Sequence, residues 1–452
     1  MTASHAYSGD NRGSMSEVFG HPRGLTFLFA TEMWERFSYY GMRSLLILYM
    51  VKFLLPEQGT HGVIGLDSLK RGLEVISGPL APQPFASEIY GFYTGLVYLT
   101  PIFGGLLADR VLGQRRTVIL GAALMAAGHF MMAFEQLFLF ALALLILGNG
   151  AFKPNISTQV GALYPRGDRR RDRAFSIFYV GINLGAFLAP LVCGSLGEEL
   201  GWHYGFAAAG VGMTIGLVIY LAAAPALPKD VLARRETTGR PLDAAGRRSI
   251  AALLLLFVPV SLFWATYEQQ GNTIALWADQ FADRNLFGFE IPVTWFQAFN
   301  PFMIFAFTPL IVAIWRRQGE NEPATTVKLA VGCLLTALAY LVMMTAAWVA
   351  GSGKASWLWL LAFFVVITIG ELYLSPTSLS LVTKVAPPSL LSMMMGLWLA
   401  TSFAGNFLAG YLGTFWSTMK QPEFFLMLAG IAGVAGAAIA LLAIPLRPLL
   451  KD

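Results

Sequence analysis

The sequence is poor in cysteine, histidine and charge. Only 2 of its 452 residues are cysteines and 5 are histidines, while charged residues make up 13%, about half the ~25% of an average soluble domain. Cys193 and Cys333 fall within apolar segments, so a disulfide framework is excluded and nothing indicates a metal or redox site. The scarcity of charge excludes a soluble globular protein.

Sequence patterns of membrane-embedded enzymes are also missing. The chain has no HExxH motif, no paired-histidine site and no GxSxG motif with a membrane-embedded histidine partner. Because covalent chemistry needs such a nucleophile, base or metal, the sequence argues against an enzyme, and we expect no cofactor.

What the chain does contain is apolar sequence, with 56% hydrophobic residues and a mean hydropathy of +0.61. Apolar runs long enough to cross roughly 30 Å of hydrocarbon indicate a polytopic, all-α membrane protein. We predict twelve spans, at residues 23–54, 86–108, 117–135, 137–164, 174–197, 203–224, 250–278, 292–315, 326–350, 356–383, 390–418 and 423–446.

The distribution of basic residues predicts the orientation. If the N-terminus is cytoplasmic, most of the 31 lysines and arginines fall in cytoplasmic segments, as positively charged loops do in bacterial inner membranes. The net charge of +5 is then explained by the basic residues of the cytoplasmic loops, and it does not indicate a nucleic-acid partner. The first run is too long and too interrupted by charge for a cleaved signal peptide, and an even number of spans places the C-terminus in the cytoplasm.

A basic polar stretch divides the runs into six and six. We predict a tail at 1–22, bundles at 23–227 and 250–452, and a cytoplasmic linker at 228–249. This is the pattern of major facilitator transporters, whose halves contain nested three-helix repeats, although other polytopic proteins also reach twelve spans. The segment GGLLADRVLGQRR at 104–116 supports that fold, because a plain positive-inside loop would not require its two glycines and its aspartate together.

The stretch TEMWERFSYYGMR places charge inside the first span. At about 100° per residue, its polar side chains share one helix face spread over roughly 140°. They are Glu32, Glu35, Arg36, Tyr39, Tyr40 and Arg43. Glu32 and Arg36 are four residues apart and can pair, so a self-neutralised patch is one interpretation; it leaves Arg43 unexplained.

The other charges well inside spans are Lys153 in helix 4, Glu268 in helix 7 and Glu371 in helix 10. Helices 1, 4, 7 and 10 open the four three-helix repeats, so a pseudo-symmetric transporter would bring these charges to one central aqueous pathway. Four glutamates face three cations, which leaves one carboxylate without a partner and able to take up a proton easily.

Depth along the helices suggests two ion pairs between the halves. Arg43 and Glu268 would pair toward the outside, and Lys153 and Glu371 would pair nearer the inside. Alternating access would then break one pair while the other forms.

These stretches resemble the proton-dependent oligopeptide transporters of the major facilitator superfamily. TEMWERFSYYGMR resembles the family's ExxERFxYYG motif, and four further segments match other signatures. These are GGLLADRVLGQRRTV from residue 104, FSIFYVGINLGAF at 175–187, FKPN at 152–155 and GELYLSPTS at 370–378. The chain lacks the two additional helices that many bacterial relatives carry between the halves, which puts statements about oligomers in doubt; we expect a functional monomer.

The resemblance implies roles for individual residues. Glu32, Glu35 and Arg36, with Glu268, would couple protons. Arg43 and Lys153 would receive the peptide carboxylate, and Glu371 the amino group, since a zwitterion is best held between separated opposite charges. Further contacts to the peptide backbone and side chains would come from Tyr39, Tyr40, Tyr98, Asn183, Asn300, Trp264, Trp398 and Ser375.

Purely structural roles are the alternative for the uncharged residues of this set. Tyrosine and tryptophan also anchor helices at membrane interfaces. Asn183 and Asn300 could form hydrogen bonds between helices. Asn300 also precedes Pro301, so its side chain could instead bond to backbone groups freed by a proline kink.

The predicted function is proton-coupled import of di- and tripeptides by alternating access across the bacterial cytoplasmic membrane. A family member with another substrate, such as nitrate or a drug-like or glycosylated compound, is the first alternative. A sensor that binds peptide without moving it is the second.

Overall fold

The computed structural model describes residues 17–58, 62–165, 168–228, 230, 244–386 and 391–450. The chain begins with a short antiparallel pair, β1 (Glu17–Val18) and β2 (His21–Pro22). Most of the predicted tail and linker lies outside these residues.

The first half of the chain forms one helical bundle. Its helices are α1 (Arg23–Tyr49, extended by η1, Met50–Gln58), α2 (Leu66–Ser77), α3 (Pro82–Leu99), α4 (Pro101–Leu107, extended by η2, Ala108–Leu112), α5 (Gln114–Met131), α6 (Phe138–Ala162), α7 (Arg170–Ala189, extended by η4, Pro190–Gly194, and η5, Leu196–Leu200) and α8 (Trp202–Ala222). Two short turns, η3 (Glu135–Leu137) and η6 (Ala224–Ala226), flank α6 and α8.

The second half forms another bundle beside the first. Its helices are α9 (Ala244–Tyr267), η7 (Glu268–Gly271), α10 (Thr273–Phe281), η8 (Val293–Ala298), α11 (Phe299–Gln318, followed by η9, Gly319–Asn321), α12 (Thr325–Ala350), α13 (Leu358–Val385), α14 (Leu391–Gly413, followed by η11, Thr414–Ser417) and α15 (Gln421–Leu450). Two small sheets complete it: β3 (Ala282–Asp283) pairs in parallel with β6 (Ala355–Ser356), and β4 (Asn285–Leu286) pairs antiparallel with β5 (Phe289–Glu290).

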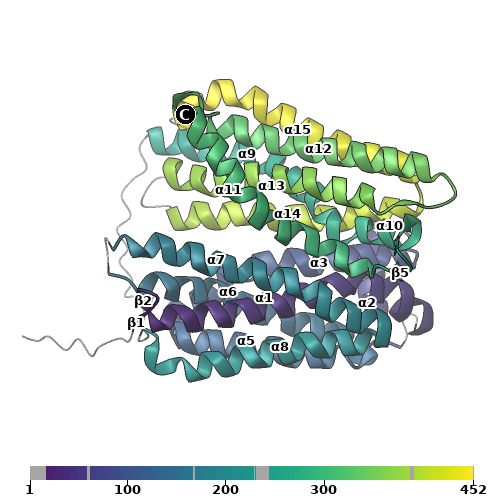
Figure 1. Ribbon diagram of the computed structural model, residues 1–452, viewed down its shortest axis with the longest axis horizontal. Coiled ribbons are helices and arrows are strands. Elements are labelled where there is room, and N and C mark those ends of the chain that lie inside the picture. The colour runs from purple at the N-terminus through teal and green to yellow at the C-terminus, as the bar shows by residue number, and fades with distance from the viewer. Residues whose placement is uncertain are drawn as a thin grey trace, which may run out of the picture.

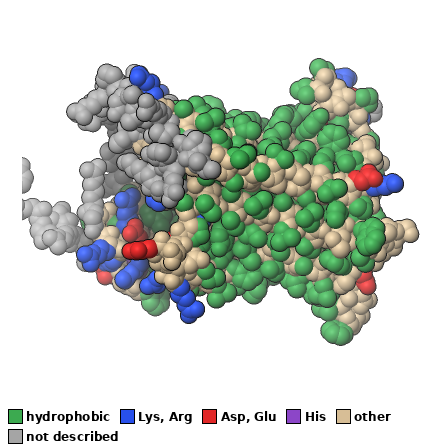
Figure 2. Space-filling view, turned by 90° about the horizontal axis from the view of Figure 1, so that it is seen from above, with side chains coloured by type: hydrophobic (Ala, Val, Ile, Leu, Met, Phe, Trp, Pro, Cys, Tyr) green, Lys and Arg blue, Asp and Glu red, His purple; other side chains and the backbone are tan. Residues whose placement is uncertain are grey.

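All twelve predicted apolar runs are helical. Within the described residues, nine helices are long and apolar enough to cross a membrane, and α1, α5 and α14 cover the remaining three runs. The helices of both bundles run along one axis of the molecule (Figure 1). A broad hydrophobic surface lies between its two ends, and lysine and arginine side chains gather at one of them (Figure 2).

We call the end that carries Arg115, Arg116, Arg170, Arg316 and Arg317 the basic end. The other, called the far end, carries α2, α10 and the strands β3–β6 (Figure 1). At the basic end the predicted glycine motif brings helices close together, since a Cβ atom at Gly104 would collide with the backbone of Gly150 on α6. Gly105 has no neighbour within 4 Å at the Cβ position, so only one of the two predicted glycines is required for packing.

Two details differ from the sequence prediction. The run at 250–278 is broken rather than continuous, because the helix ends at Tyr267 and restarts at Thr273 after a non-helical Asn272 with φ −114° and ψ −98°. An additional amphipathic helix, α2, lies between the first two spans, where no element was predicted. Its apolar residues are too few to mark a span.

The bundles touch closely along two helix pairs, α3 with α14 and α7 with α11. In the first pair the backbones are nearly in contact, because a Cβ atom at Gly91 would lie 2.5 Å from the Cα atom of Gly410 and 2.7 Å from the carbonyl oxygen of Asn406. A larger residue would push the bundles apart here, since a packed interface tolerates overfilling poorly.

Polar contacts between the bundles gather toward the far end. Lys52 pairs with Asp279 at 2.7 Å, and the Ser87 hydroxyl donates to the Asn272 side-chain oxygen at 2.9 Å. The Glu198 carboxylate accepts hydrogen bonds from the backbone N–H groups of Val293 (2.9 Å) and Thr294 (2.8 Å) at the start of η8. These contacts, together with the close approach of α3 and α14, close the far end.

Replacing Gly91 by alanine is expected to open the far end. The added methyl group collides with α14 only while the bundles are in contact, at a cost of about 1–3 kcal/mol against this conformation. Spin labels on Arg71→Cys and Lys420→Cys, both at the far end, should report a longer distance population. Gly105→Ala is the matched control, because its Cβ meets open space; an unchanged distance distribution for Gly91→Ala would contradict the prediction.

Candidate functional site

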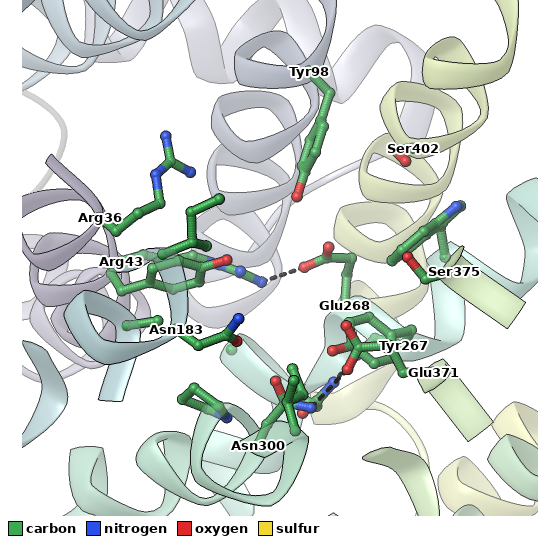
Figure 3. Close-up of a pocket in the computed structure, with 18 of the residues that line it drawn as sticks. Arg36, Arg43, Tyr98, Asn183, Tyr267, Glu268, Asn300, Glu371, Ser375 and Ser402 are labelled. Atoms are coloured by element: carbon green, nitrogen blue, oxygen red, sulfur yellow. Dashed lines mark hydrogen bonds and ion pairs between the residues drawn. The ribbon is translucent and has the colours of Figure 1, made fainter. Parts of the chain in front are cut away.

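A cavity of about 390 Å³ lies between the two bundles and is lined by residues from both. Figure 3 shows Arg36, Arg43 and Asn183 on one side and Tyr267, Glu268, Glu371 and Ser375 on the other. Charged side chains from α1, α6, η7 and α13 therefore meet in one space, as the repeat pattern predicts. Within the described residues, no three side chains that could hold a metal ion cluster together.

The stripe on α1 is ordered around Arg36. Its guanidinium donates to both carboxylate oxygens of Glu35, with one bond at 2.7 Å, and its Nε also lies 3.2 Å from Glu32 Oε1. Asn149 on α6 adds a hydrogen bond from its Nδ2 to Glu35 Oε1 at 3.1 Å. Glu35 is thus fully buried and fully engaged, and it is absent from the cavity lining.

Glu32 differs from Glu35 in its hydrogen bonding and in its contact with the cavity. It lines the cavity, and its Oε2 is buried without a hydrogen-bond partner. A buried carboxylate oxygen without a donor is costly unless it binds a proton. Of the two glutamates, Glu32 is therefore the one placed to exchange a proton with the cavity.

An ion pair between Arg43 and Glu268 connects the bundles (Figure 3). The Arg43 Nε also donates to the Tyr90 hydroxyl at 2.8 Å, and the guanidinium lies 5.9 Å from the centre of the Tyr40 ring. Both residues line the cavity, and Glu268 is the first residue of η7, directly after α9. That the pair lies toward the outside of the membrane stays a prediction.

The second predicted ion pair is not formed in this conformation. Lys153 lies over the Tyr98 ring, with Nζ 4.7 Å from its centre, and it makes no ion pair with Glu371, although the structure describes both side chains. Both residues line the cavity. Each side chain is instead held within its own bundle, Lys153 over the Tyr98 ring and Glu371 by Asn300.

Glu371 is held by neutral donors from its own bundle. Asn300 Nδ2 donates to Glu371 Oε2 at 2.9 Å and also to the Thr368 hydroxyl at 3.0 Å. The Tyr267 hydroxyl lies beside the same Glu371 carboxyl group, where it can donate to it. Asn300 therefore engages a charged group, instead of the freed backbone that Pro301 suggested.

The remaining predicted residues divide into lining and buried positions. Tyr40, Tyr98, Asn183, Trp264, Trp398 and Ser375 line the cavity. Tyr39 does not: its ring packs 5.1 Å from that of Tyr40, and its hydroxyl is buried without a partner. Together with Glu35 it forms the buried edge of the stripe, so Tyr39 lies outside the cavity lining in this conformation, and its contact with substrate stays a prediction.

Several residues of the site escaped the sequence prediction because they are uncharged; Asn149 binds Glu35 behind the cavity, and the others line it. Tyr267 directly precedes Glu268, and Asn149 lies one helical turn before Lys153, so proximity to a buried charge was the available signal. Tyr179, Gln270 and Ser402 also line the cavity, and no sequence signal distinguishes them from ordinary polar residues in a span.

Replacing Tyr267 by phenylalanine tests its bond to Glu371. Loss of one hydrogen bond to a charged group costs about 1.5–3 kcal/mol, so any ligand that relies on an oriented Glu371 should bind roughly tenfold more weakly. The measurement is the dissociation constant or KM for such a ligand. Tyr373→Phe, on the same helix as Glu371 but outside the lining, is the control; equal affinities for wild type and Tyr267→Phe would contradict this role.

Comparison with known proteins identifies the family. A family model described as the POT family matches residues 115–234 and 241–427. A di-/tripeptide transporter of Lactococcus lactis subsp. cremoris is 34% identical over 90% of this chain and 92% of its own. The peptide transporter YePEPT of Yersinia enterocolitica is 35% identical over 87% of this chain and 88% of its own.

The fold agrees with that relationship. The crystal structure of a peptide transporter POT in complex with sulfate superimposes with a TM-score of 0.87 at 32% identity, covering 97% of this chain and 98% of the other. The predicted major facilitator fold is thereby confirmed, as is the resemblance deduced from the motifs. This chain is a membrane transporter that belongs to the POT family.

Proposed function

We propose that this transporter imports di- and tripeptides together with protons. The observation that carries the proposal is the separation of opposite charges across the cavity: Lys153 on one bundle and Glu371 on the other face the same space without pairing. A short zwitterionic peptide fits this arrangement, because its two termini can neutralise both groups at once.

In this proposal the peptide carboxylate lies near Lys153 and Arg43, and its amino group near Glu371. Asn183 and Asn300 supply hydrogen bonds from opposite bundles, while Trp264 and Trp398 form apolar walls for the peptide side chains. A nitrate ion or a neutral drug-like compound would leave at least one of the two opposite charges uncompensated, which favours a peptide over those alternatives.

Glu32 is the proposed first proton acceptor. Protonation would remove one of the two carboxylates that share Arg36 and so release this guanidinium toward a peptide carboxylate in the cavity. Glu268 is the second acceptor, because protonating it would break the ion pair with Arg43 and loosen the link between the bundles. Both steps connect the proton gradient with the alternation of the two ends.

The units that move would be the bundles 23–227 and 250–452, as predicted from the sequence. We place the basic end in the cytoplasm of a bacterial cell, with both termini there, and take the monomer as the functional unit. The conformation described here then faces inward, since its far end is closed.

Uptake of labelled dialanine into liposomes tests the proposal. The purified protein is reconstituted, and accumulation is measured with and without an inward proton gradient. Accumulation that requires the gradient is the expected result. Binding of dialanine without accumulation would favour a sensor, and the absence of both binding and uptake would favour another substrate.

A further inference from the structure

A second, smaller hollow lies at the far end, apart from the central cavity. It has a volume of about 30 Å³, about that of one water molecule. Three helices surround it, α2, α3 and α14, so it spans both bundles. Its lining consists of Leu73, Ile76, Ser77, Glu88, Phe92, Phe407 and Tyr411.

Glu88 is the one acidic group in this hollow. Its side chain is only 4% exposed, and its Oε1 is buried without a hydrogen-bond partner; Ser77 at the end of α2 lines the hollow beside it. No lysine or arginine lines the hollow. A carboxyl group in such apolar surroundings either keeps its proton or pairs with a cation, and the lining of the hollow supplies no cation.

Aromatic rings from both bundles form part of the lining, beside Leu73, Ile76 and Ser77. Phe92 from α3 and Phe407 from α14 pack edge to face, with ring centroids 4.8 Å apart and planes at 84°, and Tyr411 lies one turn further along α14. Faces of aromatic rings next to a carboxylate are the surroundings that bind alkylammonium groups, through cation–π attraction and a charge-assisted hydrogen bond. The hollow has room for the ammonium group itself, with the rest of the headgroup outside it.

Helix α2 indicates where this ammonium group comes from. Leu66 and Leu73 are buried against the bundle, whereas Val75 is 85% and Ile76 is 74% exposed. A short helix that extends apolar side chains beside charged ones is typical of the membrane interface. Phe407 and Tyr411 are likewise exposed on the outer surface of α14, where lipid chains would lie.

We propose that the hollow between α2, α3 and α14 binds the ammonium headgroup of an aminophospholipid, with Glu88 as its counter-ion. Because α3 and α14 belong to different bundles, the site exists only while the far end is closed. Bound lipid therefore favours this conformation. The proposal does not depend on which substrate occupies the central cavity.

Native mass spectrometry of the purified protein tests the binding. Wild type, Glu88→Gln and the control Glu199→Gln, an exposed carboxylate at the same end, are each incubated with phosphatidylethanolamine or phosphatidylglycerol of identical acyl chains. Wild type and Glu199→Gln should retain phosphatidylethanolamine about tenfold better than phosphatidylglycerol. Glu88→Gln should lose this preference.

Three further outcomes are informative. Equal preference in wild type and Glu88→Gln would overturn the proposal and leave Glu88 simply protonated. Saturable binding of propylammonium without any preference for the ethanolamine lipid would overturn the lipid source. If Glu88→Gln fails to fold, as judged by its melting temperature, Tyr411→Leu keeps the carboxylate and removes one ring; it should reduce the preference several-fold, and an unchanged preference would contradict the site.

Discussion

Replacing Glu32 by glutamine is expected to abolish accumulation of dialanine driven by a proton gradient, while exchange of internal for external dialanine continues. Glutamine has nearly the same shape but cannot take up or release the proton. The concentration ratio reached at steady state should therefore fall to one, whatever gradient is imposed. The measurement compares gradient-driven uptake and counterflow in liposomes that contain equal amounts of protein.

The structure supplies the control for this experiment. Glu290 on β5 is 67% exposed at the far end, away from the cavity, so Glu290→Gln should accumulate peptide like wild type. Gradient-driven accumulation by Glu32→Gln would refute the assignment of the coupling proton to Glu32. Glu35→Gln is a poorer test, because Glu35 is the main partner of a buried arginine and its loss would leave that charge insufficiently compensated.

Replacing Glu371 by glutamine is expected to raise the KM for dialanine by about 30-fold or more. Removing one partner of a desolvated charge pair costs about 2 kcal/mol at least, which corresponds to that factor. The KM for N-acetylated dialanine, which has no ammonium group, should already be high in wild type and should change little in the variant. Initial rates of uptake at a fixed gradient provide both constants.

A complementary variant tests whether the protein recognises the two charged termini of the peptide independently. Lys153→Gln should raise the KM for dialanine by a similar factor. It should leave the KM for the carboxyl-amidated peptide unchanged. If both variants lost affinity for both modified peptides equally, the effect would come from a damaged cavity rather than from recognition of the termini.

The sequence was most informative about charge. Burying an ionised group in hydrocarbon is so costly that each such residue needs a functional explanation, and the positions of Arg43, Lys153, Glu268 and Glu371 therefore led directly to the cavity. The twelve apolar runs and the family motifs predicted the fold and family, which the comparisons confirm. The individual roles of the charged residues stay predictions.

Neutral residues and local breaks were not predictable in the same way. Asn149 donates a hydrogen bond to Glu35, and Tyr267 lies beside Glu371, yet tyrosine and asparagine inside a span have many other uses. A helical wheel also treats Glu32 and Glu35 as equivalent members of one stripe. Which of them faces the cavity depends on how α6 packs against α1, and that is a property of the tertiary structure.

The contact of Glu198 with the start of η8 has an evolutionary consequence. Its carboxylate binds the backbone N–H groups of Val293 and Thr294, and every residue except proline offers such a group. Any residue other than proline at position 293 would therefore keep this bond. Methods that detect contacts from correlated substitutions would find little signal between positions 198 and 293, although this contact joins the two halves of the protein.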